Sequence, residues 1–139
     1  MSASPASRAA VRLAVLAGLA LACQDDVMLI GPDNNPVLVN QTDNFSYQAS
    51  NLDNVNQTFT WTWTNTGTTA IIQQNSLVPH GITQMKITDA AGAVVYDLNI
   101  QLIYQEEQST ASGTPGAWTI ELAMYGTTGD LDFSLVNGP

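Results

Sequence analysis

Residues 57–66, QTFTWTWTNT, alternate between two kinds of side chain. The larger residues are Phe59, Trp61 and Trp63, and the residues between them are Thr58, Thr60, Thr62 and Thr64. Successive side chains of a β-strand point to opposite faces, and aromatic and β-branched residues favour strands. The stretch therefore predicts a strand with one buried aromatic face and one threonine face toward solvent.

The same alternation recurs near the C-terminus, in AWTIELAMY (117–125) and DLDFSLV (130–136). In the first run Trp118, Ile120, Leu122 and Met124 share one face, and in the second run Leu131, Phe133 and Leu135 do. The segment GTTG (126–129) separates the two runs, and glycine is typical of turns. We expect an antiparallel hairpin with a mostly polar outer face.

A longer run, AVVYDLNIQLIY (93–104), predicts a strand that bends or breaks near Asn99. Its apolar face is expected to hold Val94, Tyr96, Leu98, Ile100, Leu102 and Tyr104. Weaker strands are expected in VLVN (37–40), FSYQAS (45–50), AIIQQ (70–74) and ITQMKIT (82–88). The turn at 89–92 joins the last of these to the strand that follows.

The number and length of these strands indicate the fold class. Seven or eight short antiparallel strands in about 100 residues favour a two-layer β-sandwich, immunoglobulin-like or jelly-roll, over a closed barrel. We expect four side chains to anchor its core: Trp61, Trp63, Trp118 and Phe133.

The first 22 residues have the pattern of a signal peptide. Arg8 and Arg12 precede an uncharged apolar run over 13–22, which is too short to span a bilayer. Ala20 and Ala22 are the small residues that a signal peptidase requires before Cys23.

Cys23 is the single cysteine of the chain, so it has no partner for a disulfide within the chain. The segment LALAC (19–23) resembles a bacterial lipobox, although Ala20 and Leu21 are in the reverse of the commonest order. The resemblance implies that Cys23 is lipidated and becomes the mature N-terminus. The alternative is ordinary cleavage after Ala22, which leaves a free thiol. We expect a signal peptide (1–22), a lipidated cysteine with its tether (23–36) and a β-sandwich (37–139).

Composition indicates a globular, acidic protein. Hydrophobic residues make up 45% of the chain and charged residues 11%, with a formal net charge of −9. Without the first 22 residues the charge is −11, because Lys86 is then the single cation against twelve acids. Such a surface repels phosphate, which argues against nucleic-acid partners.

No constellation of residues predicts catalysis. His80 is the single imidazole, and Pro79 and Gly81 beside it predict a loop. The chain lacks a Gly-x-Ser-x-Gly elbow and an Asp-x-Asp-x-Asp-Gly calcium loop. We expect a protein that is not an enzyme and has no cofactor. Structural calcium bound by acidic residues and a two-carboxylate glycosidase are the weaker alternatives.

Three segments resemble a known group of proteins: NTGTTAII (65–72), ITDAAGAVVYD (87–97) and GTPGAWTIELAMYGTTGDLDFSL (113–135). They are similar to small bacterial lipoproteins of uncharacterised function, which carry a D-x-x-G-x-x-V-Y turn and a G-x-W-T-I…G-x-x-G-x-x-x-F hairpin. The ending is more loosely similar to P-domains and other jelly-roll modules of secreted peptidases. The resemblance implies an envelope β-sandwich and supplies no catalytic residues.

These observations predict a lipid-anchored module of the bacterial envelope, at the outer membrane or cell surface. Its expected role is non-catalytic binding or adhesion to another envelope protein or a glycan. Thr58, Thr60, Thr62 and Thr64 are the candidate ligand surface, although such a row also suits an adjoining sheet or plain solvent. One alternative is a self-associating polymer subunit that adds its 27–30 patch to a neighbour's open edge. Another is an accessory domain of a hydrolase.

Overall fold

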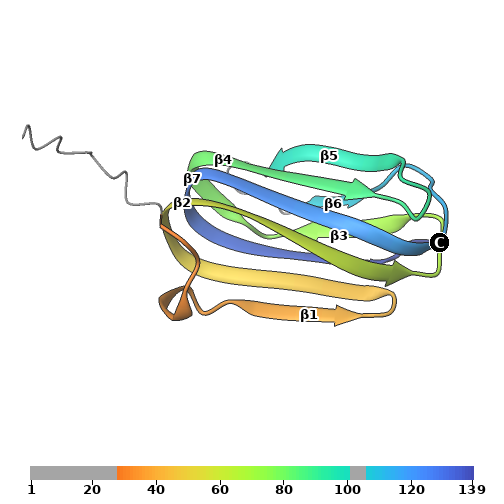
Figure 1. Cartoon of the computed structure of the whole chain (residues 1–139), viewed down its shortest axis with the longest axis horizontal. Coiled ribbons are helices and arrows are strands. Elements are labelled where there is room, and N and C mark those ends of the chain that lie inside the picture. Colours follow the sequence, from red (N-terminus) through yellow and green to blue (C-terminus); the bar gives the residue numbers. More distant parts are fainter. Residues whose placement is uncertain (1–27, 101–105) are drawn as a thin grey trace, which may run out of the picture.

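The computed structural model describes residues 28–100 and 106–139, and almost all of them lie in or between antiparallel strands (Figure 1). The elements are η1 (Pro32–Asn34), β1 (Val37–Gln41), β2 (Asn44–Asn65), β3 (Ala70–Gln74), β4 (Leu77–Thr88), β5 (Val94–Ile100), β6 (Glu106–Ser109) and β7 (Gly116–Asn137). The described ranges contain no α-helix, so none that could cross a membrane. The predicted all-β antiparallel class is confirmed.

Two long strands, β2 and β7, build both layers of the molecule. They pair antiparallel along most of their length, and both reverse direction at the left of Figure 1. The rings of Phe45 and Trp61, sixteen positions apart on β2, have centroids 5.4 Å apart. A straight strand would hold them about 50 Å apart, since it rises about 3.3 Å per residue. The two halves of β2 therefore pack face to face.

The strand order follows from this fold-back. Layer one contains β1, residues 44–49 of β2, residues 131–137 of β7, β3 and β6. Layer two contains residues 57–65 of β2, residues 116–124 of β7, the second half of β4, and β5. The two layers form the predicted β-sandwich, with one continuous ribbon shared between them.

The bend in the ribbon has a backbone cause. In β2, Asn51 and Asn54 have φ of 54° and 48°, and in β7, Gly126 and Gly129 have φ of 61° and 130°. Glycine adopts such angles freely and asparagine tolerates the left-handed region, so these residues let a strand turn. The pairing of β2 with β7 shifts register three times between residues 49 and 57 of β2.

The predicted C-terminal hairpin is wrong. The two halves of β7 pair with β2 and with other strands, not with each other, so GTTG is a bend inside one strand. Thr127 in this segment is fully buried, and its hydroxyl lies 2.8 Å from that of Thr83 on β4. The segment is thus held against a neighbouring strand instead of forming an exposed tip. In β2, the predicted strands 45–50 and 57–66 merge in the same way.

The predicted strand over 93–104 is partly wrong. β5 is described over Val94–Ile100, Leu102 and Tyr104 lie outside the described residues, and β6 pairs with β3. Val94 and Leu98, both predicted on the apolar face, are exposed, and Val95 is buried. The register against β4 shifts at this point, which identifies a β-bulge that turns Val95 inward.

The core is built around aromatic residues. Trp63 and Trp118 are 0% exposed and Phe133 is 1% exposed, whereas Trp61 is partly buried beside Phe45 and Tyr47. The rings of Trp63 and Trp118 meet edge to face, with centroids 6.1 Å apart, a favoured geometry for aromatic pairs. Each indole N–H donates to a backbone carbonyl, so burial of the two rings leaves neither N–H without a hydrogen-bond partner.

The D-x-x-G-x-x-V-Y segment is a structural turn. The buried carboxylate of Asp89 accepts backbone N–H groups from Ala91, Ala93 and Thr114, at 3.0, 2.7 and 2.7 Å. These bonds hold the pKa of Asp89 below its ordinary value, and the bond from Thr114 has the largest effect. Asp89 therefore ties the β4–β5 turn to the segment that leads into β7.

The segment before β1 is docked on the sandwich. The predicted signal peptide and Cys23 lie outside the described residues. Met28 forms an isolated parallel bridge with Val55, and Ile30 packs against the core. The Asn34 amide donates to the carbonyls of Ser50 and Asn51. The end of the predicted tether is thus attached to the bend of β2.

Candidate functional site

The outer face of layer two carries the threonines singled out in the sequence. Thr58, Thr60, Thr62 and Thr64 are all exposed, on the face opposite Phe59, Trp61 and Trp63. Thr119 of β7 lies opposite Thr62, and Thr88 of β4 lies opposite Thr119. We call these six residues the threonine face: Thr58, Thr60, Thr62, Thr64, Thr88 and Thr119.

The threonine face is regular because its strands pair without interruption. Residues 57–65 of β2 pair in unbroken register with 116–124 of β7, and 82–88 of β4 pair in unbroken register with 119–125. Neighbouring strands lie about 4.8 Å apart, and every second residue is displaced by about 6.8 Å along a strand. The hydroxyl groups therefore form one row along β2 and a second row across the three strands, through Thr62, Thr119 and Thr88.

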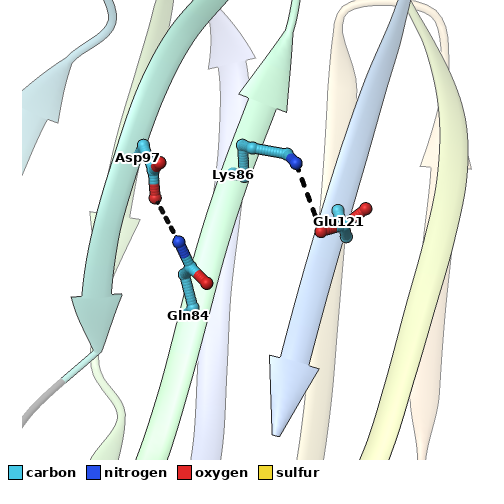
Figure 2. Close-up of polar contacts among 4 residues, drawn as sticks. All are labelled: Gln84, Lys86, Asp97 and Glu121. Carbon is cyan, nitrogen blue, oxygen red and sulfur yellow. Dashed lines mark hydrogen bonds and ion pairs between the residues drawn. The ribbon is translucent and has the colours of Figure 1, made fainter.

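A row of charged and amide groups crosses the same face (Figure 2). Lys86 Nζ lies 3.4 Å from Glu121 Oε1 on β7, and Gln84 Nε2 donates to Asp97 Oδ1 on β5 at 2.6 Å. Lys86 is the single Lys or Arg of the described residues, and its charge is balanced here by a neighbouring strand. The centre of the face thus offers hydroxyl, amide and paired charged groups.

An exposed apolar pair closes one end of this face. Tyr125 of β7 and Ile82 of β4 are register partners, and they are 56% and 53% exposed. An exposed tyrosine ring provides an apolar surface with a polar tip. Tyr125 has the same strand parity as Thr119, Glu121 and Ala123, so the sequence pattern predicts it on the outer face of β7.

The three tryptophans are part of the core and do not form a platform for a ligand. Trp63 and Trp118 are fully enclosed, and Trp61 stacks on Phe59 with ring centroids 5.3 Å apart. The buried Tyr47 lies next to this stack, and burial raises the pKa of its hydroxyl to about 12. Tyr47 therefore stays protonated and is no base near neutral pH.

The other candidate groups are dispersed. His80 is exposed and lies within β4, not in the predicted loop, because Gly81 (φ 82°) and two register shifts let the strand continue past Pro79. Asp130 and Asp132 lie on one face of β7 at the outer surface of layer one. Residues 28–100 and 106–139 hold no group of three or more His, Cys, Asp and Glu side chains that could bind a metal ion.

The predicted donor patch at 27–30 is partly engaged within its own chain. Val27 lies outside the described residues. The carbonyl of Met28 accepts the N–H of Asn56 at the open edge of β2, and the Asn40 amide donates to the carbonyl of Thr62 further along that edge. Both ends of the edge are therefore covered by the chain itself, a common protection against edge-to-edge pairing.

No protein-family model matches this chain, and no match was found among curated proteins. Among solved structures, it is similar to CsCBM6-3 from Clostridium stercorarium, which was solved in complex with cellobiose. That similarity has a TM-score of 0.40 and 14% sequence identity, and it covers 84% of this chain and 91% of that chain.

Proposed function

We propose that this chain is a lipid-anchored, non-enzymatic module of the bacterial envelope that binds an extended, neutral glycan. The threonine face is its binding surface, and the observation that carries the proposal is the unbroken register of the three strands that display it. Because the hydroxyl groups repeat along β2 and also across the strands at Thr62, a polymer with regularly repeated hydroxyl groups can contact several of them at once. Many weak contacts then add up to useful affinity.

Charge supports a neutral ligand. Beyond residue 22 the chain carries −11, so anionic polymers such as nucleic acids are repelled. The one cation on the face, Lys86, is paired with Glu121 and leaves no free positive charge for an anion. Threonine and glutamine side chains both donate and accept hydrogen bonds, as sugar hydroxyl groups require.

The exposed apolar pair supports the same ligand class. Sugars present apolar C–H faces as well as hydroxyl groups, and an exposed aromatic ring can pack against such a face. Tyr125 lies two positions from Ala123, which is the register partner of Thr58. A chain lying across the threonine face would reach the Tyr125 ring at one end.

The lipid anchor rests on the sequence alone. The LALAC segment and the lone Cys23 support it. Met28 and Ile30 both contact the sandwich, so only a few residues separate Cys23 from it in the sequence. Mass spectrometry of the mature N-terminus in the native host tests it. In the wild type we expect a diacylglyceryl group on Cys23. In Cys23→Ser we expect this modification to be absent. An unmodified thiol at Cys23 would overturn the anchor.

Binding is tested by co-sedimentation with insoluble cellulose and chitin as neutral probes. The double variant Thr60→Val, Thr62→Val keeps the side-chain shape and strand preference but removes two hydroxyl groups from the centre of the face. We expect it to bind at least about tenfold more weakly than the wild type. Thr68→Val, an exposed position between β2 and β3, is the matched control and is expected to bind normally. Equal binding by all three proteins would refute the assignment of this face.

A further inference from the structure

A hollow of about 360 Å³ lies on the outer surface of layer one, on the side of the sandwich away from the threonine face. It is formed where β1 and the start of the bends in β2 and β7 meet. Its polar and apolar lining comes mainly from Asn35, Val37, Gln48, Ser50, Asp130 and Asp132. The volume is at the lower end of the range of small-molecule sites, so the hollow suits a small ligand.

The chemistry of the lining is mixed. Asp132 accepts one hydrogen bond from the Gln48 amide at 3.1 Å and one from the Asn75 amide at 3.4 Å. Asp130 Oδ1 accepts the backbone N–H of Asn51 at 2.9 Å. These bonds fix both carboxylates in place, yet each oxygen can accept a second donor, and within the described residues Asp130 Oδ2 has no hydrogen-bond partner.

We propose that this hollow is a binding site for a single pyranose unit, with Asp130 and Asp132 accepting hydrogen bonds from sugar hydroxyl groups. Val37, which is 50% exposed, supplies an apolar wall for the C–H face of the ring. Hydrogen bonds to an ionised acceptor are stronger than those between neutral groups, so two fixed carboxylates suit a ligand rich in hydroxyl donors.

A sugar fits this hollow better than a metal ion. Calcium takes six to eight oxygen ligands. Here two carboxylates are present, and three of their four oxygens already accept hydrogen bonds from the protein. An anionic ligand is disfavoured as well, because the lining holds two acids and no Lys or Arg.

The test is an NMR titration of the full processed protein, in detergent if it is lipidated, with the methyl pyranosides of glucose, galactose and mannose. We expect at least one of them to shift the backbone amide signals of Gln48 and Asp132. Asp132→Asn, which keeps the shape of the side chain, is expected to weaken binding at least about tenfold. Glu107→Gln removes an equal charge at an exposed position of β6 and is expected to bind like the wild type.

This site stands independently of the threonine face, and the variants separate the two. The variant Thr60→Val, Thr62→Val is expected to lose polymer binding and to keep the methyl pyranoside shifts. No shift with any of the three sugars overturns the proposal. Shifts of the same amides with calcium chloride alone also overturn it, since they would identify a cation site. Unchanged unfolding curves for Asp132→Asn exclude loss of the fold as the cause of weaker binding.

Discussion

Replacement of Trp118 by alanine tests the orientation of the central strands. Trp118 is 0% exposed, its ring meets Trp63 edge to face, and its indole N–H donates to the carbonyl of Thr114 at 2.8 Å. Truncating a buried tryptophan costs about 3–5 kcal/mol of unfolding free energy. The Thr114 carbonyl keeps the N–H of Ala90 as a partner, so we expect a loss of about 3–5 kcal/mol without a further penalty for that carbonyl.

The assay is urea unfolding at fixed pH and temperature, with linear extrapolation to zero denaturant. Thr60→Ala, on the exposed face of the paired strand, is the control and is expected to cost less than about 1 kcal/mol. Because small domains are stable by only about 5–15 kcal/mol, Trp118→Ala can fail to fold. Trp118→Phe is the substitute variant in that case, with an expected loss of about 2 kcal/mol from the smaller ring and the lost indole hydrogen bond. Equal losses for Trp118→Ala and Thr60→Ala would mean that the strand faces are reversed.

Three further outcomes follow from the bend, the turn and the core. Gly129→Ala should lower the unfolding free energy by about 2 kcal/mol or more, because the φ of Gly129 is 130° and an added Cβ would meet a carbonyl of β4. Gly31→Ala is the control: its added Cβ would lie in open space, so the urea midpoint should change little. The unfolding free energy should fall as the pH drops below about 4, because the pKa of Asp89 is lower in the folded state than in the unfolded state. In Asp89→Asn, the unfolding free energy should depend less steeply on pH in this acidic range. Thr83→Val should cost about 1–3 kcal/mol in urea unfolding by leaving the buried hydroxyl of Thr127 with one partner fewer; a neutral result would contradict the bend geometry.

The alternation of side chains predicted the faces of the central strands well. Trp63, Trp118 and Phe133 are enclosed, and the threonines between the aromatic residues of β2 are exposed. This information is local, because a period of two fixes the two faces of a strand wherever the strand lies in the sheet. It fails where the backbone departs from regular geometry, as at the bulge that turns Val95 inward.

The continuity of β2 and β7 could not be predicted from the sequence. Gly126 and Gly129 are as typical of a hairpin tip as of a bend inside a strand. The difference lies in what the two halves pair with, and that depends on residues far away in the sequence, such as Asn51 and Asn54 in the partner strand. A local pattern contains no such information.

The two candidate sites differ in the same way in how far the sequence predicts them. The threonine face follows from one strand's alternation, so Thr58 to Thr64 could be selected from the sequence. The hollow beside Asp132 could not, because it combines β1, β2 and β7 from distant parts of the chain. Tyr125 lies between these cases, since its face was predictable and its partner Ile82 was not.

Mapping of backbone amide shifts tests most directly whether the threonine face binds a neutral glycan. The protein is titrated with soluble cello-oligosaccharides and chito-oligosaccharides, and the shifted signals are assigned to residues. We expect at least one series to shift the amides of Thr60, Thr62 and Thr119 together, with smaller changes in the core. Absence of shifts with both series, or shifts confined to other surfaces, would contradict it.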